Sequence, residues 1–395
     1  MKYADRTNFF KVSEIRELLK LTENPDIISF GGGMPSPSSF PVKFIERAVK
    51  KVLKNHASQA LQYGPTEGIT PLRKSLIKRM EKTRKIKCNL DQLIITTGSQ
   101  QVLDLTSKIL VNPGDYIIVE SPTYVGALSA FNAYQPNYIP IQMDENGMKT
   151  DLLEEKIKEN RDKPIKFIYA IPIFQNPTGV SLSLERKKHL MEISETYDIP
   201  ILEDEAYSEL HYSSKNPPSL KSMDKNGMVI YTHTLSKVLS PGFRLGWVIG
   251  NEEVIRKLAI AKQGADLCTN MFVQFIAEEY IESGLIEKQI VKIRKMYKRK
   301  RDIMLKALEK HFPKDSKWTK PDGGMFIWVT LPVKIDTKEM FLDAIKAKVA
   351  YVHGASFCPD GTGHNTMRLN FSNTDDNKIE EGIKRLGKII KERLV

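Results

Sequence analysis

The chain has 395 residues, of which 41% are hydrophobic, so it is long enough for a large core and for more than one domain. No stretch approaches the roughly 18–20 continuous apolar residues of a membrane span, and residues 1–6 lack the apolar segment of a signal peptide. Cys88, Cys268 and Cys358 are far apart and in no metal-like spacing, so we expect no metal site and a reducing, cytoplasmic setting.

The net charge is +12, because 60 lysines and arginines outnumber 48 aspartates and glutamates. A lysine-rich surface explains this balance, and so does nucleic-acid binding, but the latter needs a concentrated basic patch or a recognised module. The densest basic run, 292–301, places Ile293, Met296 and Tyr297 on one side of a helical pattern. We therefore interpret it as the solvent face of a long helix and expect neither nucleic acid nor a membrane as a partner.

Strand-like and helical segments alternate along the chain, which predicts an α/β fold. The predicted strands and strand-like runs cover 27–30, 92–97, 116–119, 166–172, 200–207, 228–231 and 323–328. The predicted helices cover 14–21, 44–53, 102–110, 184–197 and 341–347, with further helices from 71, 124, about 287 and 378. The run 166–172 is apolar almost throughout, which is typical of a buried parallel strand.

Polar or glycine-bearing loops follow one predicted strand after another. The loop 31–35, Gly-Gly-Gly-Met-Pro, lets backbone N–H groups approach a ligand, although a plain flexible turn has the same composition. In an open parallel sheet, ligands bind outside the carboxyl ends of the strands. We therefore expect the later loops to converge on one place. These loops carry Ser99, Tyr124, Asn176, Asp204 and Lys237.

Two stretches on this edge of the sheet suit an anion. The helix that begins at Ser99 and Gln100 presents free N–H groups, as phosphate sites do, although an ordinary strand-to-helix turn looks the same. Lys237 follows two hydroxyls and precedes an arginine, so this stretch can hold an anion while one amine stays free for covalent chemistry. The flanking residues are Thr234, Ser236 and Arg244.

Together these side chains provide the functional groups that are required to bind pyridoxal phosphate. The Lys237 amine can bond to the cofactor aldehyde, and Asp204 can keep the ring nitrogen protonated so that the ring withdraws electrons. Asn176 and Tyr207 can donate hydrogen bonds to the phenolate oxygen, and Tyr124 can stack on the ring. The phosphate would be held by Arg244, Thr234, Ser236 and the helix start at Ser99 and Gln100.

Three motifs resemble those of the fold-type I pyridoxal-phosphate enzymes, specifically the class I aminotransferases. They are Asn176-Pro-Thr-Gly179, Asp204-Glu-Ala-Tyr207, and Ser236-Lys237 with Arg244. The resemblance covers essentially the whole chain and is closest to the branch with 2-aminoadipate, kynurenine II and archaeal multisubstrate aminotransferases. The pieces that match this branch are 15–18, 28–35, 61–63, 97–101 and 367–369.

The resemblance implies a division of the chain into a large and a small domain. Residues 1–40 would form an N-terminal arm and helix, which belongs to the small domain and covers the site. Residues 41–290 would form the large cofactor-binding domain, with a mostly parallel seven-stranded sheet between helices. Residues 291–395 would complete the smaller α+β domain.

The resemblance also implies substrate and subunit roles. Arg368 would pair with the substrate α-carboxylate, assisted by Asn176 and the Gly33 backbone. Tyr63 would reach the phosphate of the neighbouring subunit, which makes a homodimer necessary for activity. Arg16 corresponds to an arginine used for acidic side chains, although a solvent-facing helix arginine explains it equally well.

The activity implied is transfer of an amino group from an L-amino acid to a 2-oxo acid, for which we expect 2-oxoglutarate, with ping-pong kinetics. A β-lyase or a decarboxylase on the same fold would use nearly the same cofactor residues. A MocR-type transcription regulator also has an effector half of this kind, but it carries an N-terminal DNA-binding domain, for which we expect no room before the first helix. The donors handled in this branch include 2-aminoadipate, glutamate, aromatic and leucine-like amino acids, and kynurenine.

Overall fold

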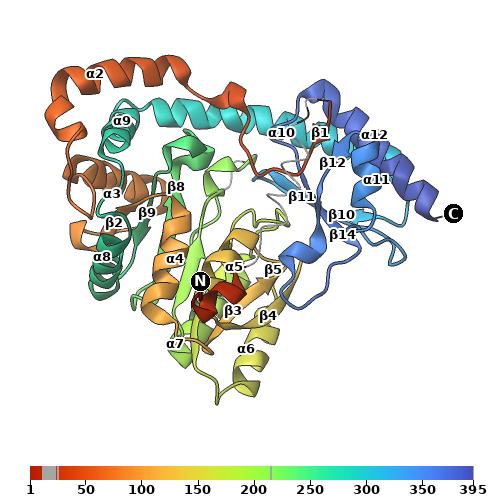
Figure 1. The fold of residues 1–395 in the computed structure, drawn as a ribbon, viewed down its shortest axis with the longest axis horizontal. Helices are drawn as coiled ribbons and strands as arrows, with labels where there is room; N and C mark the ends of the chain where they lie inside the picture. The colour runs from red at the N-terminus through yellow and green to blue at the C-terminus, as the bar shows by residue number, and fades with distance from the viewer. Residues whose placement is uncertain (11–23, 25, 214–215, 395) are drawn as a thin grey trace.

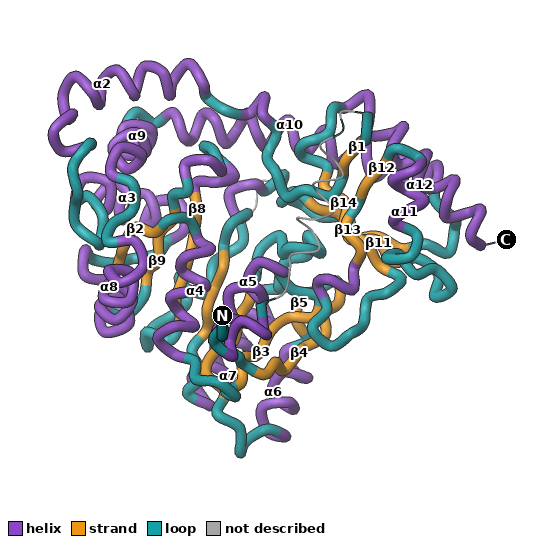
Figure 2. The backbone as a smooth tube through the Cα atoms, viewed as in Figure 1, coloured by secondary structure: helices purple, strands orange, loops and turns teal. Residues whose placement is uncertain are grey.

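The computed structural model describes residues 1–10, 24, 26–213 and 216–394. The predicted helix 14–21 and Arg16 lie outside the described residues. The strands gather into two separate groups, a large sheet and a smaller one (Figure 2). Within the described ranges, no helix has both the length and the apolar character needed to cross a membrane.

The large sheet has the strand order β2-β9-β8-β7-β6-β3-β4-β5. Its strands are β2 (Leu93–Thr96), β3 (Tyr116–Ser121), β4 (Asn137–Asp144), β5 (Gly147–Met148), β6 (Ile165–Ala170), β7 (Ile201–Asp204), β8 (Val229–Thr234) and β9 (Gly246–Ile249). The five strands from β4 to β8 along this order are parallel, whereas β9 runs antiparallel to both β8 and β2. The predicted α/β fold with a mostly parallel sheet is confirmed. As described, this sheet has eight strands rather than the predicted seven, because the two-residue β5 joins its edge as a hairpin strand.

Both faces of this sheet are buried, because alternate strand residues enter two different cores. Ile94 and Val248 pack with the helices of one face, and Ile95 and Ile249 pack with those of the other. One core includes α4 (Ser99–Leu110), α5 (Val125–Phe131) and α8 (Glu252–Asp266). The other includes α3 (Thr70–Arg84), α6 (Thr150–Glu159), α7 (Leu184–Tyr197) and α9 (Met271–Glu282). Burial on both sides explains why several of these strands begin with a continuous apolar run rather than with alternating apolar and polar residues.

The smaller group of strands contains residues from both ends of the chain. A four-stranded antiparallel sheet is formed by β10 (Lys317–Trp318), β11 (Phe326–Thr330), β14 (Thr366–Asn370) and β13 (Val352–His353). Nearby, β1 (Ile28–Ser29) pairs in parallel with β12 (Val349–Ala350). Strand β11 begins three residues later than predicted, because Gly323 and Gly324 turn closely around the Phe174 ring. Two helices accompany these strands: α11 (Phe341–Lys346) lies beside the C-terminal α12 (Asp376–Leu394).

Helix α10 (Leu285–His311) connects the two groups of strands and runs along the top of the molecule with α2 (Val42–Ala60) and α9 (Figure 1). Its basic run turns Ile293 and Tyr297 inward and leaves Lys292 and Lys295 exposed, which agrees with the predicted solvent face. Lys300 differs, because it is buried and donates to the carbonyl oxygen of Thr374 at 2.5 Å. The domain boundaries at residues 40 and 290 stay a prediction, and α10 spans the second of them.

Candidate active site

Lys237 ends a short 3-10 helix, Leu235–Lys237, that follows β8 directly. Its Nζ atom donates a hydrogen bond to the carbonyl oxygen of Gly33 at 3.0 Å and lies 5.8 Å from the centre of the Tyr207 ring. Burial lowers the pKa of the Lys237 amine to about 8, and the positive charges of Arg368 and Arg244 act in the same direction. With this pKa, roughly a tenth of the amine is unprotonated at pH 7, and this fraction can act as a nucleophile or a base.

Asp204 stands at the end of β7 and is buried. Tyr169 donates a hydrogen bond from its hydroxyl to Oδ2 of Asp204 at 3.0 Å, whereas Oδ1 has no hydrogen-bond partner among the described residues. Burial raises the pKa of Asp204 to about 6, against the lowering effects of Tyr169 and Lys237. An orphaned carboxylate oxygen in a buried site suits a ligand N–H, which is what a protonated pyridine nitrogen presents.

The other two acids at this strand end have a different function, because side chains alternate along a strand. Glu205 forms an ion pair with Arg84, with Nη2 of the arginine 2.5 Å from Oε1. Glu203 accepts hydrogen bonds from the backbone N–H groups of Leu220 and Lys221 at 2.7 and 2.8 Å. Both acids are therefore satisfied by the protein itself, and Asp204 is the one that retains a free oxygen.

Arg368 on β14 reaches across to the loop that follows β6. Its Nη1 donates to Oδ1 of Asn176 at 2.9 Å, and its Nη2 donates to the carbonyl oxygen of Gly31 at 2.6 Å. The guanidinium carbon lies 4.4 Å from the centre of the Phe326 ring, and burial lowers the pKa of Arg368 to about 10. Asn176 in turn donates from Nδ2 to the Tyr207 hydroxyl at 3.3 Å. The site thus contains a buried cation with planar donors, which suits a carboxylate.

Arg244 packs against the start of α4. A Cβ atom on Gly98 would lie 2.7 Å from Nη2 of Arg244, and Gly98 has a φ of +73°, a backbone conformation that favours glycine. The backbone N–H groups of Ser99 and Gln100 follow at the same helix end. A guanidinium beside a helix N-terminus concentrates donors and positive potential, which favours a phosphate.

The hydroxyls of Thr234 and Ser236 lie 2.8 Å apart. Thr234 donates its single proton to the carbonyl oxygen of Leu245 at 2.9 Å and accepts from the backbone N–H of Ser236 at 3.1 Å. Thr234 therefore caps the short helix that carries Lys237 and holds Ser236 in place. This local role had not been predicted for it.

Tyr124 and Gln100 form a second pair at the edge of the site. The Tyr124 hydroxyl donates to Oε1 of Gln100 at 3.4 Å, and Nε2 of Gln100 donates to the carbonyl oxygen of Gly126 at 2.6 Å. Burial raises the pKa of Tyr207 above its ordinary value, and the nearby Tyr124 adds to this effect. Of the other predicted residues, Tyr63 is 80% exposed, and Arg16 is not among the described residues.

Three residues that support the site were not predicted from the sequence. Tyr169 bonds to Asp204, and Phe326 packs against both Arg368 and Tyr207. Gln175 holds the loop of Asn176, since its Oε1 accepts from the backbone N–H and the hydroxyl of Thr178 at 2.9 and 2.8 Å. The only signal for Gln175 was its position directly before the Asn-Pro-Thr-Gly motif, whereas Tyr169 and Phe326 look like ordinary core aromatics in sequence.

Comparison with known proteins identifies one family. Residues 25–386 match the family described as Aminotransferase class I and II. The chain is 50% identical to aromatic-amino-acid aminotransferase 1 of Thermococcus litoralis over 394 residues, which is 99% of this chain and 94% of that protein.

Solved structures agree with this match. The kynurenine aminotransferase of Pyrococcus horikoshii, in complex with PMP, superposes with a TM-score of 0.96 at 49% identity and covers 100% of this chain and 98% of its own. The α-aminoadipate aminotransferase of Thermus thermophilus, complexed with N-(5'-phosphopyridoxyl)-L-leucine, has a TM-score of 0.92 at 36% identity and covers 99% of this chain and 98% of its own. Pyridoxal phosphate is thus the cofactor that both the comparisons and the orphaned oxygen of Asp204 indicate.

Asp204→Asn should stabilise the cofactor-free protein in a pH-dependent way. The pKa of Asp204 is raised from 3.8 to about 6 in the folded protein, so ionising this carboxyl costs stability as the pH rises through that interval. Asparagine cannot ionise, and we expect a gain in the free energy of unfolding on the order of 3 kcal/mol at pH 8, shrinking to about 1 kcal/mol at pH 4.5. Urea denaturation at both pH values measures this, and an equal effect at both would contradict it.

Proposed function

This chain belongs to the aminotransferase class I and II family, and from that premise we propose that it moves the amino group of an L-amino acid to a 2-oxo acid. It is an aminotransferase with pyridoxal phosphate as its cofactor. We propose 2-oxoglutarate as the acceptor and a ping-pong cycle. The observation that carries the proposal is the buried amine of Lys237 beside the orphaned oxygen of Asp204 and the donors of Arg368.

The proposed proton shuttle is Lys237. When bound, pyridoxal phosphate supplies an electron sink that makes a proton on the substrate Cα acidic. Lys237 has a pKa near 8, so it can take that proton at neutral pH and return it as an acid. Asp204 would accept the N–H of the cofactor ring on Oδ1. Tyr207 accepts from Asn176 and keeps its own proton, which leaves it free to donate to the phenolate oxygen.

We assign the phosphate to the end of α4 and to the arginine beside it. Arg244 and the N–H groups of Ser99 and Gln100 would supply most donors, and Ser236 would add a hydroxyl. Thr234 would act through Ser236, because its own proton is held by Leu245. Tyr124 would lie against the cofactor ring.

We assign the substrate α-carboxylate to Arg368. Two parallel N–H groups of a guanidinium match the two oxygens of a carboxylate, and burial strengthens such a pair. Asn176 and the backbone of Gly33 would assist, since Asn176 already bonds to Arg368, and Gly33 to Lys237. Arg16 is proposed to bind an acidic side chain of the substrate.

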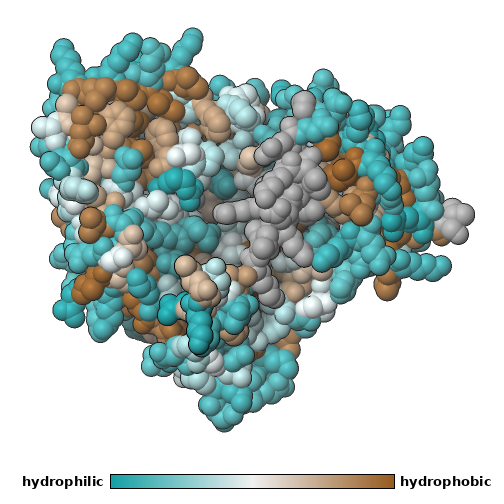
Figure 3. All heavy atoms as spheres, in the orientation of Figure 1, coloured by the Kyte–Doolittle hydropathy of each residue, from teal (hydrophilic) through white to brown (hydrophobic). Residues whose placement is uncertain are grey.

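We further propose a homodimer in which Tyr63 completes the neighbouring site. Figure 3 shows hydrophobic surface at the upper left, where Figure 1 places α2 and α9. Exposed apolar side chains of this region include Val42, Leu53 and Leu61, and they continue to Tyr63 in the following loop. An exposed apolar surface of this kind is typical of a subunit interface. Cytoplasmic location stays a prediction from the sequence.

Two alternative activities, β-elimination and decarboxylation, can be distinguished from transamination by the products that they release. A β-lyase releases ammonia and a decarboxylase releases carbon dioxide, whereas an aminotransferase makes one new amino acid for each donor consumed. A nucleic-acid-binding protein would instead retard labelled DNA in a gel at low salt and would no longer bind it at moderate salt.

Lys237→Ala should abolish turnover, with a loss of at least about 10³-fold, because both the covalent attachment and the proton shuttle are removed. The visible absorbance of the lysine-bound cofactor should also disappear. Amino-group transfer from phenylalanine or 2-aminoadipate to 2-oxoglutarate measures the first, and absorption spectroscopy the second. Lys108→Ala, on the outer side of α4, serves as the control and should retain both. Normal transamination by Lys237→Ala would exclude the assignment.

Arg16→Ala should distinguish donors by the charge of their side chains. We expect kcat/KM for 2-aminoadipate and glutamate to fall about tenfold, since one charge-assisted hydrogen bond is lost, while the value for phenylalanine changes less than about threefold. Arg256→Ala, which removes an exposed arginine of α8, should leave all donors unchanged. If acidic donors are unaffected by Arg16→Ala, the role given to Arg16 is wrong.

Mixing two defective subunits should restore activity if Tyr63 acts across the interface. A subunit with Lys237→Ala retains Tyr63, and a subunit with Tyr63→Ala retains Lys237. In a mixed dimer one site then has both residues, so random reassociation should restore about a quarter of the wild-type sites. Activity after joint refolding, compared with each variant refolded alone, measures this. No gain on mixing would show that Tyr63 acts within its own subunit or not at all.

A further inference from the structure

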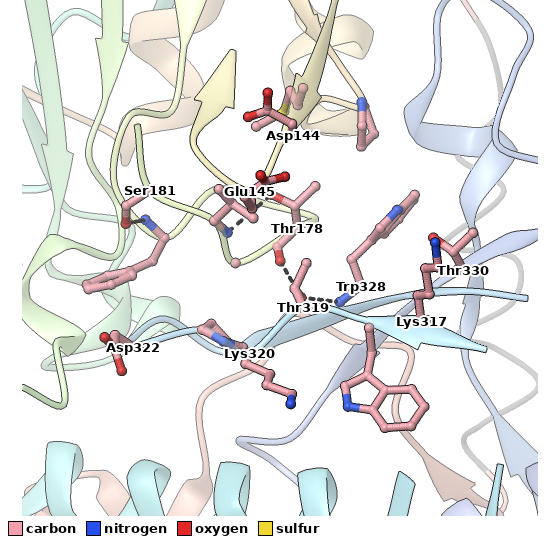
Figure 4. A pocket seen from close by; sticks show the side chains of 17 residues that line it. Asp144, Glu145, Thr178, Ser181, Lys317, Thr319, Lys320, Asp322, Trp328 and Thr330 are labelled. Carbon is pink, nitrogen blue, oxygen red and sulfur yellow. Dashed lines mark hydrogen bonds between the residues drawn. The ribbon is translucent and has the colours of Figure 1, made fainter. Parts of the chain in front are cut away.

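A cleft of about 690 Å³ lies between the large sheet and the small one (Figure 4). One wall contains the end of β4 and the loop 178–181, and the other contains β10, β11 and the segment between them. A hydrogen bond crosses this cleft: Thr319 donates from Oγ1 to the carbonyl oxygen of Thr178 at 2.8 Å. Thr178 lies two residues after Asn176, so this bond reaches the loop that carries the proposed carboxylate ligand.

The loop is held on its other side by the large domain. Gln175 accepts from Thr178, and its Nε2 donates to Glu120 and to the carbonyl oxygen of Pro122 at 3.1 and 2.7 Å. Gly179 closes the loop by donating from its backbone N–H to the carbonyl oxygen of Gln175. The carbonyl of Thr178 is thus turned outward, toward the small sheet.

Thr319 is equally well fixed on the side of the small sheet. Its backbone N–H donates to the carbonyl oxygen of Trp328, and its Oγ1 accepts from the backbone N–H of Trp328, both at 3.0 Å. These two bonds direct the single hydroxyl proton at Thr178. In the antiparallel pair β11–β14, Trp328 stands directly opposite Arg368. A short path of hydrogen bonds therefore joins the Asn176 loop to the strand pair that carries Arg368.

The two surfaces also meet closely beside this bond. Gly179 has a φ of +72°, and a Cβ atom on it would lie 2.7 Å from the carbonyl oxygen of Phe326. The loop backbone therefore packs directly on β11. Dispersion attraction in this contact and the directional bond of Thr319 both oppose a separation of the two surfaces, and only the hydrogen bond also fixes its direction.

We propose that Thr319 is a positioning residue, which sets the separation between Asn176 and Arg368 so that one substrate carboxylate meets both. The inference rests on the proposed carboxylate-binding roles of those two residues. An incoming carboxylate competes for the donors of Arg368 and so disturbs the bond between Arg368 and Asn176. The bond of Thr319 lies outside the site and persists through that exchange.

The test compares Thr319→Val, which removes the hydroxyl at almost constant volume, with Thr319→Ser, which keeps it. The probes are 3-phenylpropionate and glutarate, carboxylates that lack an amino group and cannot react, titrated into the holoenzyme by calorimetry. We expect the Kd of the tighter probe to rise about fivefold in Thr319→Val and to stay within about twofold in Thr319→Ser. For the best donor, KM should rise similarly while kcat and the absorbance of the bound cofactor change little.

Thr330→Val is the matched control, because Thr330 lines the same cleft without a hydroxyl contact to the loop among the described residues. It should leave the Kd unchanged. Unchanged affinity in Thr319→Val would overturn the inference, as would a similar loss in Thr319→Ser. Should Thr319→Val fail to fold, Thr319→Ala decides by the same criterion.

Arg368→Gln separates this inference from the proposed function. If Arg368→Gln binds both probes as well as the wild type does, the carboxylate role of Arg368 is wrong, and the inference about Thr319 is overturned with it. If Arg368→Gln loses affinity while Thr319→Val does not, only the inference about Thr319 is wrong.

Discussion

The hydrogen bond from Arg368 to Asn176 is the contact on which the site depends, because its two partners come from different sheets. Asn176 follows a strand of the large sheet, and Arg368 lies on a strand of the small one. A displacement of one sheet relative to the other along the line between these groups would change the distance between them directly. The close packing of Gly179 on β11 and the bond from Thr319 to Thr178 resist such a displacement.

A second constraint is the burial of opposite charges around Lys237. Burial disfavours the charged form of any group, so it lowers the pKa of Lys237 and raises the pKa of Asp204. Arg368 and Arg244 add positive charge to the same space. The site is therefore rich in positive charge, which a phosphate and a carboxylate would neutralise. A strained electrostatic environment of this kind is typical of functional sites.

Strands β2, β3, β6, β7 and β8 of the large sheet were predictable because both faces of the sheet are buried there, whereas β4 and β5 were not predicted. Helix α7 occupies the predicted 184–197, and the apolar runs at 116–119 and 166–172 lie within or overlap strands β3 and β6. Strand β9 was missed, because its four residues follow a turn and run against their neighbours. A pairing direction is a long-range property that a short apolar segment does not encode.

Sequence by itself determined which functional groups stand at the strand ends and, through the family motifs, that Lys237, Asp204, Asn176 and Arg368 belong to one site. It could not distinguish the environments of Glu203, Asp204 and Glu205, nor reveal the support from Tyr169, Phe326 or Thr319. Only the tertiary structure decided these points. The physical reason is that neighbouring acids on a strand point to opposite faces of the sheet. One face brings an acid to a partner within the protein and the other face brings it to the ligand site. Which face is which depends on how segments far away in the sequence pair and pack.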